Sequence, residues 1–171
     1  MQNMREVVEI EVLLPETEIV ATGVSEEDYM EHYAAHFCEW VDGRVSRVAP
    51  ETLTHNDLRG YLTALLDTYL AYRPMGRVIY PPFVYSMPAL NRKREPDLML
   101  LLASNTGELT DTYYVGAADI VIEVVSKESS KRDRGDKFDE YEASGVREYW
   151  LIDSRRKDAT FYRLNAEGTF E

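Results

Sequence analysis

The stretch that decides the fold is residues 116–153, GAADIVIEVVSKESSKRDRGDKFDEYEASGVREYWLID. It opens with an apolar run, 119–125, whose length suits a strand buried inside a sheet. A helix is expected over 130–144, because Gly145 stands where a glycine commonly ends a helix. A second apolar strand, 148–152, follows. The order strand, helix, strand predicts an α/β fold.

Upstream patterns extend this architecture. Apolar residues recur at helical spacing over 53–72, which predicts a long amphipathic helix. The Asp42-Gly43 pair between two alternating runs predicts a β-hairpin over 37–48. The apolar run 97–102 suits another buried strand. The remaining expected elements are an edge strand or arm at 6–14, a helix at 25–35, a bulged edge strand at 77–85, a loop at 103–117 and a last strand at 160–164.

The bulk composition is that of a globular protein. A length of 171 residues suits one domain, and 44% hydrophobic residues are enough for a sizeable core. Cys38 is the only cysteine, which excludes an intrachain disulfide and fits a reducing compartment such as the cytoplasm. We find no signal-peptide pattern and no apolar run of membrane-spanning length, so we expect a soluble cytoplasmic protein with no membrane partner.

The charge balance is strongly acidic. The chain carries 19 basic and 31 acidic residues, for a net charge of −12. This counts against simple electrostatic binding of nucleic acid, which usually requires a basic patch. It does not exclude a metal-dependent enzyme of phosphate chemistry, because a bound cation brings positive charge into an acidic site.

Two acidic residues interrupt runs that should otherwise be buried. Asp97 opens one predicted strand, and Glu123 lies in the middle of the next. A carboxylate inside an apolar strand is costly unless it is paired or binds a metal. If the two strands are neighbours, both carboxylates reach one sheet edge and suit Mg²⁺ or Mn²⁺. Asp119 shares a strand face with Glu123 and is either a third acid of the site or only a strand-start residue.

The predicted helix that follows supplies cations. Asp133, Lys137 and Tyr141 are spaced by four residues and share one helix face. Lys137 can project over the two acids, where it would orient water and counter charge on a phosphorane-like transition state. Arg132 and Arg134 are expected to hold phosphate.

The stretch 116–153 resembles the restriction-endonuclease-like family of the PD-(D/E)XK nuclease superfamily. The resemblance continues through Arg94-Glu-Pro-Asp97, the hairpin CEWVDGRVSRV and His55, and it covers residues 24–164. It implies a restriction-endonuclease-like core with a central mixed β-sheet flanked by α-helices and an N-terminal β-hairpin extension. Residues 1–23 would then form an arm of the same single domain. It also implies a metal-dependent phosphodiesterase centre at Asp97 and Glu123.

The chain departs from the superfamily pattern at the lysine. That pattern has a lysine two residues after the second acid, where this chain has Val125. The resemblance implies that Lys137, on the following helix, takes its place. Lys127 shares the strand face of Glu123 by period and is a competing candidate, although we expect Lys137 because a helix holds its side chain better. The resemblance also favours a site role for His55, whose alternative is to cap the long helix.

The leading functional hypothesis is a Mg²⁺- or Mn²⁺-dependent endonuclease that acts on DNA. The alternative is a catalytically weak or inactive nuclease-fold protein that serves as a binding or assembly module. A third hypothesis is a metal hydrolase that acts on a phosphoester outside nucleic acids. We also expect a homodimer, because the segments 6–14 and 77–85 leave sheet edges to be paired or covered.

Overall fold

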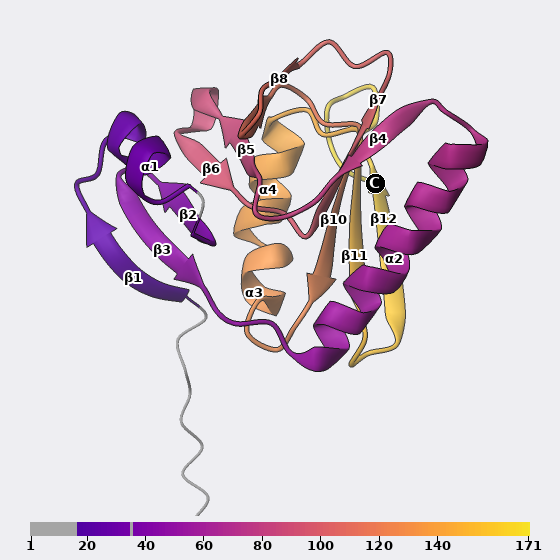
Figure 1. Cartoon of the computed structure of the whole chain (residues 1–171), viewed down its shortest axis with the longest axis horizontal. Helices are drawn as coiled ribbons and strands as arrows, with labels where there is room; N and C mark the ends of the chain where they lie inside the picture. The colour runs from indigo at the N-terminus through magenta and orange to yellow at the C-terminus, as the bar shows by residue number, and fades with distance from the viewer. Residues whose placement is uncertain (1–16, 35) are drawn as a thin grey trace, which may run out of the picture.

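The computed structural model describes residues 17–34 and 36–171, so the strand expected at 6–14 lies outside it. Within the described residues the strands form two mixed sheets (Figure 1). The first contains, in spatial order, β1 (Thr17–Thr22), β3 (Arg44–Val48), β2 (Cys38–Val41), β6 (Arg92–Arg94), β5 (Val84–Met87), β9 (Tyr113–Val115) and β8 (Glu108–Leu109). The second contains β12 (Asp158–Arg163), β11 (Glu148–Asp153), β10 (Ile120–Val125), β7 (Leu98–Leu102) and β4 (Gly76–Ile79).

Helices accompany both sheets. They are α1 (Glu26–His32), α2 (Leu53–Tyr72), the 3-10 turn η1 (Pro88–Leu90), α3 (Ser130–Asp133) and α4 (Asp136–Ala143). The mixed α/β class and its flanking helices are therefore confirmed, with the strands divided between two sheets rather than placed in one. In the described part of the chain, no helix is long and apolar enough to span a membrane.

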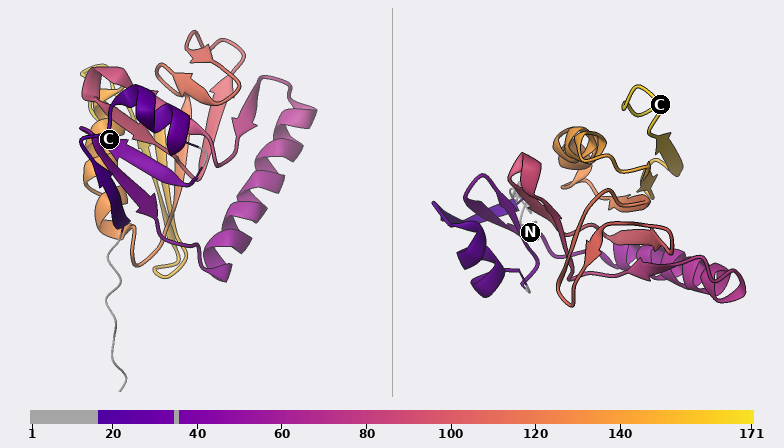
Figure 2. Two further views of the ribbon diagram at one scale, coloured as in Figure 1. Left: turned by 60° about the vertical axis from the view of Figure 1, so that its left-hand side comes forward. Right: turned by 90° about the horizontal axis from the view of Figure 1, so that it is seen from above.

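The second sheet lies between helices on its two faces (Figure 2). Alternate residues of a strand point to opposite faces, so Leu98, Leu100 and Ile122 pack with Leu70 of α2. Their sequence neighbours on the other face pack with Tyr141 of α4. Both faces of the sheet are thus covered, and a charged residue on its central strands needs a partner.

The pairing of β7 with β10 brings the two predicted acids together. The strands are antiparallel, with Ile120 opposite Leu100 and Ile122 opposite Leu98. One further step in this register sets Glu123 opposite Asp97, on the sheet face that α4 covers. The prediction that the two strands are neighbours is confirmed.

Several local signals give the expected elements. Asp42 and Gly43 have φ values of 48° and 81°, the conformation of a tight two-residue hairpin turn, and β2 pairs with β3 around them. Helix α2 has the predicted bounds, and Thr52 rather than His55 caps it by accepting a hydrogen bond from the His55 backbone N–H. Helix α1 ends at His32, three residues before the expected limit.

Other expectations are wrong in detail. The segment 77–85 is two strands, because Pro81 and Pro82 interrupt it and the chain passes from the second sheet to the first. The segment 103–117 contains the short strands β8 and β9 rather than only a loop. The helix expected over 130–144 is divided into α3 and α4 at Gly135, whose φ and ψ of −125° and −97° are not helical.

Candidate metal centre

Asp97 lies directly before β7, where two contacts orient its carboxylate. Its Oδ2 accepts a hydrogen bond from the Val124 backbone N–H at 2.6 Å and lies 3.0 Å from His55 Nε2. The side chain is 15% exposed, so it remains accessible to small ligands at the end of the strand. The contact with Val124 ties Asp97 to the strand that carries Glu123.

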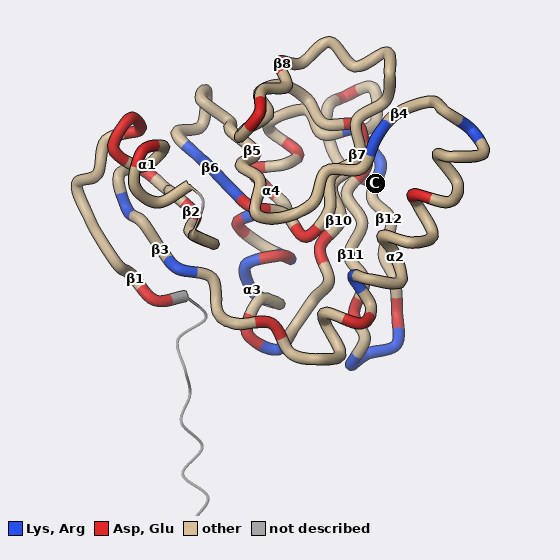
Figure 3. The backbone as a smooth tube through the Cα atoms, in the orientation of Figure 1, with Lys and Arg blue, Asp and Glu red and all other residues tan. Residues whose placement is uncertain are grey.

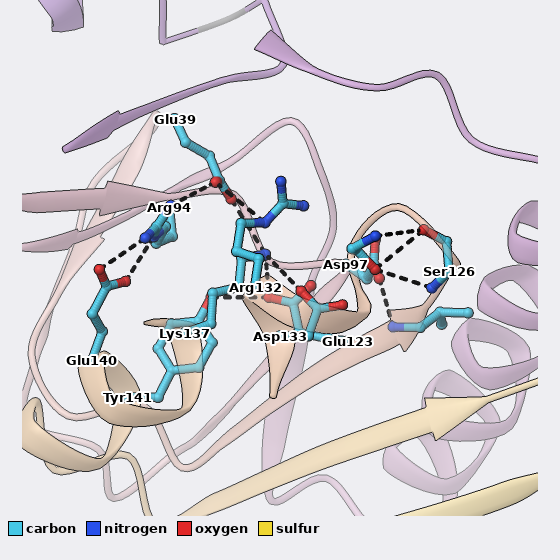
Figure 4. Close-up of polar contacts among 12 residues, drawn as sticks. Glu39, Arg94, Asp97, Glu123, Ser126, Arg132, Asp133, Lys137, Glu140 and Tyr141 are labelled. Atoms are coloured by element: carbon cyan, nitrogen blue, oxygen red, sulfur yellow. Dashed lines mark hydrogen bonds and ion pairs between the residues drawn. The ribbon is translucent and has the colours of Figure 1, made fainter. Parts of the chain in front are cut away.

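Glu123 is buried on β10 and is held by two residues of α4. Its Oε1 accepts hydrogen bonds from Lys137 Nζ at 2.7 Å and from the Tyr141 hydroxyl at 2.9 Å (Figure 4). Burial raises the pKa of Glu123 to about 8, the nearby Asp133 and Asp97 carboxylates add to the rise, and Lys137 opposes it. A bound cation would favour the ionised form of this carboxyl group.

Lys137 is the buried cation of the centre. Beyond Glu123, its Nζ lies 3.3 Å from Glu39 Oε1 and 3.8 Å from Asp133 Oδ1, and its side chain is 2% exposed. Burial alone would lower the pKa of Lys137, but Glu123 and Glu39 raise it, so the ammonium form persists. Asp133 and Lys137 face one another although the break at Gly135 separates their helices.

Glu39 and Arg94 were not predicted as site residues. Glu39 on β2 is 1% exposed, and its Oε2 accepts a hydrogen bond from Arg94 Nη1 at 2.8 Å. Arg94 also donates to both carboxylate oxygens of Glu140, at 2.7 and 2.8 Å. This buried network connects the first sheet to α4 beside Lys137 (Figure 4). The one sequence signal was a glutamate between Cys38 and Trp40 in a short strand with buried neighbours.

Glu95 is a third residue that was not predicted as a site residue. It is 7% exposed, and within the described residues neither of its carboxylate oxygens has a hydrogen-bond partner. Burial, followed by the negative charge of Glu39, raises the pKa of Glu95 to about 8. The carboxyl group therefore carries its proton for most of the time at neutral pH.

A pocket joins these side chains, and we call it the metal pocket. It is lined by Val48, Ala49, Pro50, Glu51, Thr52, His55, Glu95, Asp97, Glu123, Val124, Ser126, Glu128, Ser129, Arg132 and Lys137. Arg132 is 10% exposed, and its Nε and Nη1 have no hydrogen-bond acceptor among the described residues, with Glu39 Oε2 at 3.9 Å. Unsatisfied guanidinium donors in an acidic pocket suit a phosphate oxygen.

Glu51, His55 and Asp97 form a further cluster at the mouth of the metal pocket. Each offers one potential ligand atom, and these atoms lie within 4.8 Å of one another. His55 Nδ1 is 3.4 Å from Glu51 Oε2, and Glu51 Oε1 accepts a hydrogen bond from Arg59 at 2.7 Å. Burial alone would lower the pKa of His55, but the hydrogen bond that its ring donates to the Asp97 carboxylate raises it. His55 thus either orients Asp97 or shares a cation with it.

Of the predicted accessory residues, Asp119, Arg134 and Lys127 are not among those that line this pocket. Asp119 is at the opposite end of β10, about 13 Å along the strand from Glu123, and accepts hydrogen bonds from the Leu102 N–H and the Asn105 side chain, each at 2.8 Å. It therefore has the strand-start role. Arg134 lies 3.3 Å from Asp153. Lys127 is exposed in the turn that follows β10.

The residues that hold a divalent cation must offer hard oxygen ligands in an accessible position. Asp97 offers such an oxygen with its side chain 15% exposed, and Glu123, although buried, lines the same pocket. Glu95 lines the same pocket, and its carboxyl group is a further oxygen ligand that a cation could use after the proton is lost. The donor set therefore fits Mg²⁺ or Mn²⁺.

Comparisons with known proteins agree with the fold. The model of a family named Uma2 and described as "Putative restriction endonuclease" matches residues 26–171. A solved structure, a "putative nuclease belonging to DUF820" from Anabaena variabilis ATCC 29413, is similar with a TM-score of 0.63 and 17% sequence identity. The match covers 74% of this chain and 71% of that chain. A comparison with curated proteins gives no match.

Proposed function

Because the chain belongs to the Uma2 family of restriction-endonuclease-like proteins, we propose that it is a metal-dependent endonuclease that hydrolyses phosphodiester bonds of DNA. The observation that carries the proposal is that Asp97, directly before β7, and Glu123, on the neighbouring strand β10, line one pocket, with the buried ammonium of Lys137 on Glu123. The arrangement supplies two carboxyl groups and one fixed positive charge at the same pocket, and a bound cation would favour the ionised form of Glu123.

Asp97 and Glu123 would hold the cation. When bound, Mg²⁺ or Mn²⁺ would supply a more acidic water and neutralise charge on the phosphate. The backbone N–H of Val124 and the hydroxyl of Tyr141 keep the two carboxylates in place before any ligand arrives. Such preorganisation matters because a ligand that must reorient contributes less to binding and to the rate.

Lys137 would act as the positively charged catalytic residue. Its ammonium is fixed by Glu123, Glu39 and Asp133, so little reorganisation is needed when negative charge develops on the phosphate. Arg132 would contact a phosphate oxygen through the donors that have no acceptor in the described residues. Both cations line the pocket that would receive the phosphate, so they act locally in a chain whose net charge is −12.

A binding or assembly module is the second candidate function. The observation that favours it is the direct 2.7 Å contact between Lys137 and Glu123, which engages one oxygen of the proposed metal ligand. A buried ion cluster can also serve only to specify the fold. This alternative predicts no cleavage of nucleic acid with any divalent cation.

The test is cleavage of labelled single-stranded and duplex DNA and RNA with Mg²⁺ or Mn²⁺. Asp97→Asn and Glu123→Gln should each abolish most of the cleavage and weaken cation binding. The matched control is Asp57→Asn, which removes an exposed carboxylate of α2 outside the metal pocket. Cleavage that survives both site variants would come from a contaminant or another site and would refute the proposal.

A further inference from the structure

A groove borders the metal pocket on the side of the hairpin, and we call it the Phe37 groove. It is lined by His36, Phe37, Arg47, Val48, Ala49, Pro50, Glu51 and Arg59. The segment 48–51, which connects β3 to α2, lines both the groove and the metal pocket. A polymer with one unit in the metal pocket can therefore place a neighbouring unit in the groove.

Phe37 provides a fixed aromatic surface in this groove. The residue is 47% exposed, directly before β2. Its backbone carbonyl accepts a hydrogen bond from the Val48 N–H at 2.9 Å, which ties it to the end of β3. An aromatic ring on a fixed backbone can stack on a flat apolar ligand at low entropic cost.

Basic side chains accompany the ring. Arg47, on β3, is 57% exposed, and Arg59 and His36 also line the groove. Figure 3 marks basic positions on β3 in a molecule whose chain carries an excess of acidic residues. An aromatic ring flanked by arginines is complementary to a nucleotide, which has a flat base and an anionic phosphate.

We propose that the Phe37 groove binds one unstacked base of the strand whose phosphodiester enters the metal pocket, with Arg47 on an adjacent phosphate. This inference rests on the proposed nuclease function and deepens it by naming the substrate class. A base can reach the ring only after leaving the duplex stack, so the preferred substrate is single-stranded or locally unpaired nucleic acid. Stacking also gives an acidic protein affinity that does not depend on salt.

The test measures binding without cleavage. The full-length protein is titrated in Ca²⁺ into a fluorescent single-stranded oligodeoxynucleotide and into the matching duplex. We expect tighter binding of the single strand, and about a 5- to 100-fold loss of that binding in Phe37→Ala, the range for one base stacked on an aromatic side chain. Phe37→Leu, which keeps apolar bulk, covers the case in which alanine impairs folding, and Phe37→Trp should restore binding.

Phe161→Leu is the matched control, because Phe161 is a 58% exposed phenylalanine on β12 outside the groove. Equal binding of single strand and duplex, or no effect of Phe37→Leu, overturns the inference. If the groove instead binds an apolar peptide or a second copy of the chain, Phe37→Leu should likewise leave oligonucleotide binding unchanged.

The outcomes also separate this inference from the proposed function. Cleavage that depends on Asp97 but not on Phe37 leaves the nuclease standing and removes the base site. Binding that depends on Phe37, without cleavage under any metal condition, supports the base site and removes the nuclease.

Discussion

Replacement of Lys137 by methionine removes the ammonium of the charge cluster and keeps most of the side-chain length. The ammonium has contacts of 2.7, 3.3 and 3.8 Å with Glu123, Glu39 and Asp133. Loss of one partner from a buried ion pair costs about 3–5 kcal/mol, since the remaining carboxylates lose their counter-charge. Because Arg94 still neutralises Glu39, we expect a loss at the low end of this range. The free energy of unfolding should decrease by about 3 kcal/mol and the Tm by roughly 10 °C.

The effect on catalysis is separate from this loss of stability. Loss of one preorganised charge at a transition state typically lowers the rate about 10²- to 10³-fold, and we expect that decrease for Lys137→Met. The cation should still bind, because an ammonium group is not a ligand. Initial cleavage rates are measured well below the Tm of the variant, beside Mn²⁺ titration calorimetry and thermal unfolding.

Lys127→Met is the matched control for the lysine assignment. Lys127 is exposed in the turn after β10 and is not among the residues that line the metal pocket, so we expect its loss to have little effect on rate or stability. The reasoning is refuted if Lys127→Met abolishes cleavage while Lys137→Met does not. It is also refuted if Lys137→Met abolishes Mn²⁺ binding, since Lys137 would then act only through the structure of the site.

Three further predictions concern Glu123, Glu95 and the exposed face of α2. Because the pKa of Glu123 is raised to about 8, protons should compete with the cation, and calorimetry should show Mn²⁺ affinity falling as the pH decreases below 8; a flat profile would contradict this. In the folded state Glu95 keeps its proton up to about pH 8, whereas in the unfolded chain it loses the proton near its ordinary pKa of 4.5. Glu95 therefore lowers the free energy of unfolding progressively as the pH rises from 4.5 to 8. Glu95→Gln should remove that decrease and raise the free energy of unfolding, measured with urea at pH 7, by up to about 3 kcal/mol. If the pH dependence of stability is unchanged in the variant, Glu95 does not hold a proton in the folded state. We propose a homodimer whose interface contains the exposed Tyr61, Leu65 and Tyr69 of α2. Light scattering should then give twice the chain mass of 19.7 kDa for the wild type and the single mass for Leu65→Glu. A monomeric wild type would exclude the dimer.

The elements that depend on neighbouring residues could be predicted from the sequence. The bounds of α2 follow from apolar spacing and the hairpin from Asp42-Gly43, because both signals act over a few neighbouring residues. The proximity of Asp97 and Glu123 could be predicted from sequence for two reasons. A buried acid is costly without a partner, and two successive buried strands were expected to be neighbours in the sheet. These signals need no knowledge of distant contacts.

The parts that the sequence did not reveal depend on tertiary contacts. Helices α3 and α4 separate at Gly135, where an added Cβ would meet the Lys131 carbonyl oxygen at 2.9 Å, and the helical pattern of the side chains continues across the break. Glu39 and Arg94 are 55 residues apart and meet only when the first sheet forms. Their partners could not be read from the spacing of either segment.

Diffraction at the manganese absorption edge, from crystals of the full-length protein grown with Mn²⁺, tests the central claim most directly. The account predicts one anomalous peak in the metal pocket, coordinated by carboxylate oxygens of both Asp97 and Glu123. A peak coordinated by Glu51 and His55 without Glu123, or an empty pocket at saturating Mn²⁺, would contradict it.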